Sequence, residues 1–229
     1  MCLIQIGSGS ASLDTKIQDG FSNYIISKNI KKKIFIIEAN SIHINNLKKF
    51  YQKKSANVKI FNLAIIPDDL DLKIMDFYYC LEDFPNYQIF SNSKSFVKKH
   101  FPDGKIKKKS VECLRISEFF DKNNINKIDY LSIDIEGMDY SVLMKLDLKK
   151  FKIENISFEH LHLTFWQKIK IVTKLINNSY FFSGMGFDIR KSDWMFTKNF
   201  KFKKLQTFLL PFTPRRIWKR YQFSNLSNF

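Results

Sequence analysis

Hydrophobic and polar positions follow two patterns along the chain, one typical of buried strands and one of amphipathic helices. Short apolar or β-branched runs of strand length occur at residues 3–6, 34–37, 58–61, 128–133 and 153–158. Two longer segments with apolar residues at helical spacing, 13–29 and 41–54, separate the first three runs. Strands that alternate with helices predict right-handed βαβ units and a parallel sheet.

Each of the two helical segments carries an apolar stripe. In residues 13–29 the apolar stripe includes Ile17, Phe21 and Ile25. In residues 41–54 the stripe follows Ser41, which we expect to be the N-cap. Both segments therefore predict helices that pack one face against the sheet.

The alternation of predicted strands and helices is interrupted in the middle and near the end of the chain. Residues 71–80 and 109–116 are predicted to be additional strands, and the stretch 84–105 between them is predicted to be an insertion over one end of the sheet. Residues 187–198 predict a hairpin of two short strands joined by Lys191 and Ser192. We expect one domain over residues 1–198, followed by a tail over 199–229.

Composition supports a packed globular protein and narrows its class. The chain has 229 residues, of which 45% are hydrophobic, with 24 Phe against only 7 Gly and 5 Pro. No apolar run reaches the ~18 residues that span a bilayer, and no signal-peptide pattern is present, so we expect a cytoplasmic location. Cys2, Cys80 and Cys113 have no zinc-ligand spacing and are expected to be reduced thiols.

The net charge of +16 is concentrated in the tail, which is also aromatic. After Asp193 the chain has no acidic residue but eight Lys or Arg. Such a segment fits an anionic membrane surface, which would make the protein peripheral at the inner face of the membrane. Two alternatives stay open: the tail binds nucleic acid, or its aromatic residues dock on the domain.

A glycine-rich loop follows the first predicted strand. Gly7, Ser8 and Gly9 stand where the first βα turn of a doubly wound sheet binds cofactors, and glycine there admits a close backbone approach by a ligand. Glu38 ends the next strand, where an acidic side chain accepts hydrogen bonds from ribose hydroxyls. The alternatives are a purely structural turn and a Glu38 that caps the following helix.

The chemistry is predicted to lie in residues 129–143. Asp134 and Glu136 stand two apart at the end of a buried strand, and they point the same way if the strand continues through both. They are candidates to share a metal, orient a hydroxyl or act as a base. The alternative is that Glu136 or Asp139 supplies negative charge at a helix N-terminus.

His160 is a further catalytic candidate. It follows Glu159 just after the strand predicted at 153–158, at the expected rim of the site, and an imidazole can remove a proton from a hydroxyl near neutral pH. The alternative is a histidine packed at the strand end. Asp134, Glu136 and Glu159 supply oxygen ligands of the kind that Mg²⁺ accepts, so a dependence on Mg²⁺ stays open.

Five short blocks together resemble the FkbM-type S-adenosylmethionine-dependent methyltransferases. They are, in chain order, IQIGSGSA, IIEAN, FNLAI, IDYLSIDIEGMDYSVL and ISFEH. The resemblance implies a Rossmann-like class I methyltransferase of the α/β class, with a mostly parallel seven-stranded sheet, a C-terminal antiparallel hairpin and helices on both faces.

The resemblance also assigns roles to residues of this chain. It places Gly7, Ser8 and Gly9 at the cofactor, Glu38 at its ribose and Asn62 near its adenine. It places Asp134, with Glu136, at the transferred methyl group and the acceptor. The chain departs from the family pattern at two positions, with Ser132 where a Lys is usual and Gln5 where an Asp is common.

These observations predict an O-methyltransferase that uses S-adenosyl-L-methionine to modify a hydroxyl, on a sugar of a cell-surface glycan or a related small metabolite. Alignment of sulfur, methyl and oxygen, with a base for the hydroxyl proton, is what the displacement needs. Two other classes stay open: a nucleic-acid-binding protein or RNA methyltransferase that uses the basic tail, and a non-catalytic binding protein on the same fold.

Overall fold

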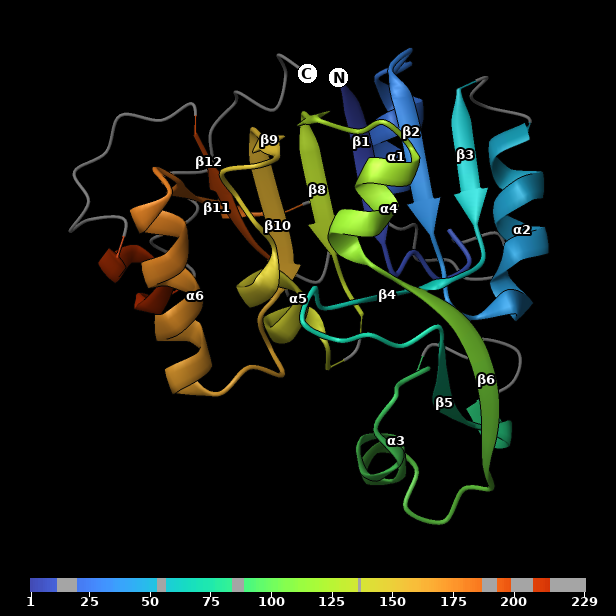
Figure 1. The fold of residues 1–229 in the computed structure, drawn as a ribbon. Coiled ribbons are helices and arrows are strands. Elements are labelled where there is room, and N and C mark those ends of the chain that lie inside the picture. The colour runs from blue at the N-terminus through green and yellow to red at the C-terminus, as the bar shows by residue number, and fades with distance from the viewer. Residues whose placement is uncertain are drawn as a thin grey trace.

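A central sheet with helices on both faces organises the computed structural model of the chain (Figure 1). The structure describes residues 1–11, 20–52, 57–83, 89–135, 137–186, 193–198 and 208–214. The sheet has seven strands in the order β11-β12-β10-β8-β1-β2-β3. Their bounds are β1 (Cys2–Ile6), β2 (Lys33–Ile37), β3 (Val58–Phe61), β8 (Tyr130–Ile133), β10 (Asn155–Glu159), β11 (Phe181–Met185) and β12 (Asp193–Thr197).

Five of the seven strands run parallel to one another. β3, β2, β1, β8 and β10 pair in parallel, and β12 pairs antiparallel with both β10 and β11. The predicted α/β class, with a mostly parallel sheet and a C-terminal hairpin, is therefore confirmed. In Figure 1 the arrows of the parallel strands point down, so their carboxyl ends meet at one edge of the sheet.

The faces of the sheet are covered by different helices. α1 (Gly20–Ser27) and α2 (Ser41–Gln52) pack with Leu3 and Ile36 on one face. α4 (Ile116–Lys122), α5 (Asp139–Lys145) and α6 (Phe165–Asn177) pack with Ile4 and Ile37 on the other. Since neighbouring residues of a strand point to opposite faces, a sheet buried on both faces favours long apolar runs, and β2 is apolar throughout after Lys33. Residues 12–19, which include the predicted stripe residue Ile17, lie outside the described residues.

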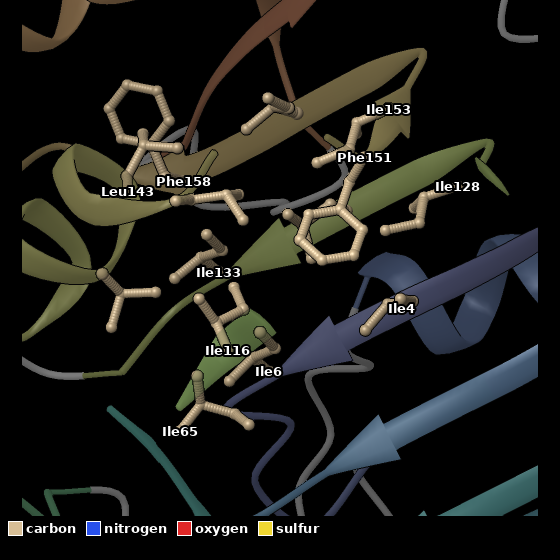
Figure 2. Close-up of a cluster of buried hydrophobic side chains, with 14 of the residues drawn as sticks. Ile4, Ile6, Ile65, Ile116, Ile128, Ile133, Leu143, Phe151, Ile153 and Phe158 are labelled. Atoms are coloured by element: carbon tan, nitrogen blue, oxygen red, sulfur yellow. The ribbon is translucent and has the colours of Figure 1, made fainter. Parts of the chain in front are cut away.

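The larger apolar cluster lies between the sheet and the second set of helices. Figure 2 shows Ile4 and Ile6 of β1, Ile133 of β8 and Phe158 of β10 in this cluster, with Leu143 of α5. All five of these side chains are buried. This core fixes the spacing of the strands, and so the positions of the residues that follow them.

A smaller unit lies beyond the carboxyl ends of the parallel strands (Figure 1). It contains β4 (Ala64–Ile66), β5 (Ile74–Cys80), the short 3₁₀ helix η1 (Leu81–Asp83), α3 (Lys94–His100) and the long β6 (Ile106–Arg115). The sheet order is β4-β6-β5, with β4 parallel and β5 antiparallel to β6. Both extra strands predicted from the sequence are present. Of the predicted insertion, residues 84–88 lie outside the described chain.

Three predicted strands differ from the observed ones. The runs at 128–133 and 153–158 are each split, because β7 (Lys127–Ile128) and β9 (Lys152–Ile153) form a separate two-stranded sheet. Backbone hydrogen bonds from Asp129 to Cys2 and from Glu154 to Ile128 mark the breaks. The first hairpin strand is β11, earlier in the chain than predicted. Residues 187–192, which the predicted hairpin includes, lie outside the described residues.

The described part of the tail packs on the domain. Phe208, Leu210 and Phe212 lie against the main core, around the 3₁₀ helix η2 (Leu210–Phe212). The ring of Phe212 is 5.7 Å from that of the buried Trp194. For these residues the docking alternative is confirmed, whereas residues 199–207 and 215–229 are outside the described chain. Among the helices that the structure describes, none is long and apolar enough to cross a membrane.

Candidate active site

The register of the parallel strands brings the predicted site residues to one edge of the sheet. Ile6 lies opposite both Ile37 and Ile133, Ile37 lies opposite Phe61, and Ile133 lies opposite Phe158. The residues that follow these five strand positions therefore form one row, which we call the carboxyl edge: Gly7, Asn62, Glu38, Asp134 and Glu159. Ligands of open α/β sheets bind outside this edge.

The two glycines of the first loop have different surroundings. The amide of Gly7 donates to the Ile37 carbonyl at 2.9 Å, and a Cβ at Gly7 would overlap the carbonyl oxygen of Asp134. The missing side chain at Gly7 therefore allows the ends of β1 and β8 to lie close together. The sequence analysis had explained this glycine only by the close approach of a ligand. At Gly9, by contrast, no described heavy atom lies within 4 Å of the position that a Cβ would take. Both have positive φ, of 79° and 56°, which glycine tolerates best.

Glu38 holds the glycine loop from the end of β2. Its two carboxylate oxygens accept hydrogen bonds from the backbone amides of Gly9, at 2.8 Å, and Asn40, at 2.7 Å. The carboxylate is buried, and burial raises its pKa, whereas His43 and the backbone amides of Asn40, Gly9 and Ser8 act in the opposite direction. The Glu38 carboxylate is thus held beside the glycine loop, and its predicted contact with a ribose stays a prediction.

The helix after β2 is capped by Asn40 and not by Ser41 or Glu38. The Oδ1 atom of Asn40 accepts from the backbone amide of Ile42 at 3.2 Å, and Ser41 is already the first residue of α2. The hydroxyl of Ser41 instead accepts a hydrogen bond from Lys109 of β6. The Nδ2 atom of Asn40 is buried and has no hydrogen-bond partner within the described chain. A buried donor without a partner is costly, so this amide fits a ligand at the carboxyl edge.

Asn62 lies where it was predicted, directly after β3. Its side-chain amide donates to the carbonyls of Glu38, at 2.9 Å, and Ala39, at 3.1 Å. Asn62 therefore fixes the backbone that carries the Glu38 carboxylate. Its predicted contact with an adenine stays a prediction.

The acidic loop after β8 is organised by Asp139, which the sequence analysis considered only as a helix N-terminal charge. β8 ends at Ile133, so the strand does not continue through Asp134, whose amide donates to the Ile6 carbonyl at 2.9 Å. The condition for Asp134 and Glu136 to point the same way is not met, and Glu136 is outside the described residues. The carboxylate of Asp139 accepts from the amides of Ile135, at 3.0 Å, and Gly137, at 3.3 Å.

Asp139 is itself buried at the start of α5. Burial raises the pKa of its carboxyl to about 6, and the amides that donate to it act in the opposite direction. The carboxylate thus links the loop to the first turn of α5. These hydrogen bonds fix the backbone at Ile135, next to Asp134, and at Gly137.

His160 is buried directly after β10. Its ring stacks on that of Trp194, with centroids 4.7 Å apart and planes at 13°. This is the packed arrangement that the sequence analysis gave as an alternative. Its role as a base stays a prediction.

The unit beyond the carboxyl edge contacts this edge at two places. A Cβ at Gly137 would be 3.8 Å from the hydroxyl oxygen of Ser91, so residues just before α3 lie against the I-D-I-E-G loop. The ring of Phe96 on α3 meets that of His162 edge-on at 5.0 Å, and Nε2 of His162 is 3.5 Å from a carboxylate oxygen of Glu159. The unit therefore covers the end of β10.

Metal ligands do not gather in the described structure. Among the residues placed by it, no group of three His, Cys, Asp or Glu side chains could hold a metal ion. The suggested dependence on Mg²⁺ thus gains no support from the geometry.

The fold and the carboxyl edge together define the class of protein. A seven-stranded sheet with this strand order, a glycine loop after β1 and a buried acidic residue after β2 make a Rossmann-like class I methyltransferase. The family model of the methyltransferase FkbM domain matches residues 10–197. The chain therefore belongs to the FkbM methyltransferase family. A comparison with curated proteins found no match.

The match begins after the glycine loop. Gly7 and Gly9 precede residue 10, whereas Glu38, Asn62, Asp134 and His160 all fall within the matched range. The glycine loop was thus predicted from its position after a buried strand, and its binding of a cofactor stays a prediction. Asn40 and Asp139 were missed as site residues, although each stands in a block that carried the resemblance.

Proposed function

We propose that the protein transfers the methyl group of S-adenosyl-L-methionine to a hydroxyl oxygen on a sugar of a cell-surface glycan or a related small metabolite. The observation that carries this proposal is the pairing of Glu38 with the glycine loop, in a chain of a methyltransferase family. A buried carboxylate at the end of the second strand accepts hydrogen bonds from ribose hydroxyls.

Three features of the carboxyl edge fit the cofactor. The space beside Gly9 admits a ligand close to the backbone, the buried Nδ2 of Asn40 offers a donor, and the Glu38 carboxylate offers acceptors. Ser8 contributes its backbone amide to the same carboxylate. Asn62 fixes the segment that carries Glu38. We assign binding of the cofactor to these residues.

The reaction requires little covalent chemistry from the protein. When bound, S-adenosyl-L-methionine supplies a methyl group on a positively charged sulfur. Asp134, directly after β8, is proposed to orient the acceptor hydroxyl and receive its proton. Glu136 and His160 are the other proposed groups for this task. Alignment of the acceptor supplies most of the rate gain.

The proposal extends to the organisation and location of the protein. We assign catalysis to residues 1–198, which include the insertion at about 84–105, and place the protein in the cytoplasm. The sugar acceptor rests on the family resemblance. RNA methylation, the other reading of the basic composition, is an outcome of the test below.

A methyl-transfer screen tests the proposal. The full-length protein is incubated with S-adenosyl-L-methionine carrying a labelled methyl group and with glycan, lipid-linked saccharide or RNA fractions. We expect label in a saccharide fraction. Asp134→Asn should lower turnover by a much larger factor than it changes cofactor affinity, whereas Asp121→Asn, an exposed change on α4, should leave both unchanged. Label only in RNA, or full turnover by Asp134→Asn, would contradict the proposal.

A further inference from the structure

Four large apolar side chains are exposed near the start of α6. They are Leu161, Phe165, Trp166 and Leu209, with exposed fractions of 50%, 60%, 70% and 53%. Leu161 lies in the turn after β10, Phe165 and Trp166 begin α6, and Leu209 precedes η2. We call this set the apolar rim. A Trp exposed to this degree is unusual, because tryptophan is highly buried on average.

The apolar rim rests on a fixed support. The ring of Phe165 is 5.8 Å from that of Trp166 and 5.7 Å from that of Phe212. Phe212 contacts Trp194, which is part of the main core. The start of α6 is held by a capping box between Thr164 and Gln167. These contacts hold the exposed side chains on ordered elements.

Three lysines lie near the apolar rim, as does the carboxylate of Glu159, which pairs with His162. Lys170 follows Trp166 by four residues on α6, so the two share a face of the helix. Lys168 lies over the ring of Trp194, with Nζ 5.8 Å from its centroid. Burial lowers the pKa of His162, and His100 and Lys99 of α3 are near enough to act in the same direction. α6 contains no acidic residue, and the sequence has none after Asp193.

We propose that the apolar rim and its lysines dock the protein on an anionic lipid bilayer. Aromatic and Leu side chains enter the headgroup region, while lysines interact with anionic headgroups. The three lysines favour an anionic surface over a neutral protein partner. Arg215, Arg216, Lys219 and Arg220 follow the described segment and add positive charge to the chain. The docking does not depend on the proposed methyl transfer.

Co-sedimentation with vesicles tests the apolar part of this docking. Full-length protein is mixed with vesicles of phosphatidylglycerol and phosphatidylcholine, or of phosphatidylcholine alone. We expect binding to the anionic vesicles, and a loss of about tenfold in affinity for Trp166→Ser. The matched control is Ile74→Ser on β5. The Ile74 side chain is 61% exposed, and its replacement should leave vesicle binding unchanged.

A second pair of variants tests the charge. Lys170→Gln should weaken binding about fivefold at low salt and have less effect as salt rises. Lys48→Gln, exposed on α2 at the other end of the sheet, should have no effect. Equal vesicle binding by wild type and Trp166→Ser would overturn the proposal. The proposal would also be overturned if the protein bound no vesicles and bound RNA with an affinity that Trp166→Ser leaves unchanged.

Discussion

Gly7 and Gly9 stand two residues apart, yet they are required for different reasons. Gly7 lies against the backbone of Asp134, so it joins the ends of β1 and β8. Gly9 lies beside open space and gives its amide to Glu38. Gly7 is required by packing, and Gly9 by the positive φ of the loop that Glu38 holds.

This difference is measurable with one substitution at each position. Gly7→Ala should destabilise the fold strongly or prevent folding, because its Cβ would overlap the carbonyl of Asp134. Gly9→Ala should cost only about 1 kcal/mol, since it meets no described atom but places Ala at positive φ. Urea unfolding of both variants decides the point. Equal losses at the two positions would show that the packing against Asp134 is not what requires Gly7.

Asp139 should make stability depend on pH. Its folded pKa, about 6, is above the ordinary 3.8, so the folded state binds the proton more tightly than the unfolded chain does. The resulting stabilisation is full below about pH 4 and is lost as pH rises through about 6, a change of up to about 3 kcal/mol.

The comparison of wild type with Asp139→Asn isolates this effect, because the amide does not titrate. The unfolding free energy of wild type minus that of the variant should fall as pH rises from 4 to 7. Asp121→Asn is the control, since its carboxylate is exposed in an ion pair with Lys150. A wild-type-minus-variant difference that is the same at every pH would contradict the account of Asp139.

At the level of elements, the buried parallel strands and the helices between them could be predicted because apolar spacing reports burial directly. The division of 128–133 into β7 and β8 could not, since it depends on the pairing of β7 with β9, far away in the sequence. The position of β11 was missed for a similar reason. Its pairing with β12 includes an irregularity between Phe182 and Gly184 that local patterning does not reveal.

The start of α6 gives a prediction at this scale. Thr164 accepts from the Gln167 amide at 3.3 Å, and the Gln167 side chain accepts from the Thr164 amide at 2.9 Å. Thr164→Ala should therefore lower the unfolding free energy by about 1 kcal/mol. Thr173→Ala, exposed in the middle of the same helix, should not destabilise it. A Thr164→Ala variant as stable as Thr173→Ala would show that the capping box contributes little.

Across the whole molecule, residues from distant parts of the sequence meet at the carboxyl edge. Glu38 could be predicted because its position after a strand is visible in the sequence. The roles of Asn40 and Asp139 could not, since each depends on which backbone amides the fold places beside it. The tail shows the same limit: Phe212 packs on Trp194, whereas Leu209 nearby is exposed.

Calorimetric titration with S-adenosyl-L-methionine tests the central claim most directly. Wild type should bind the cofactor, and Glu38→Gln should weaken binding by at least about tenfold, the value of losing a charge-assisted hydrogen bond. Glu112→Gln, an exposed change on β6, is the matched control and should bind as wild type does. Circular dichroism shows whether each variant is folded. A wild-type chain that binds no cofactor, or a folded Glu38→Gln variant with unchanged affinity, would contradict the assignment of the carboxyl edge as the cofactor site.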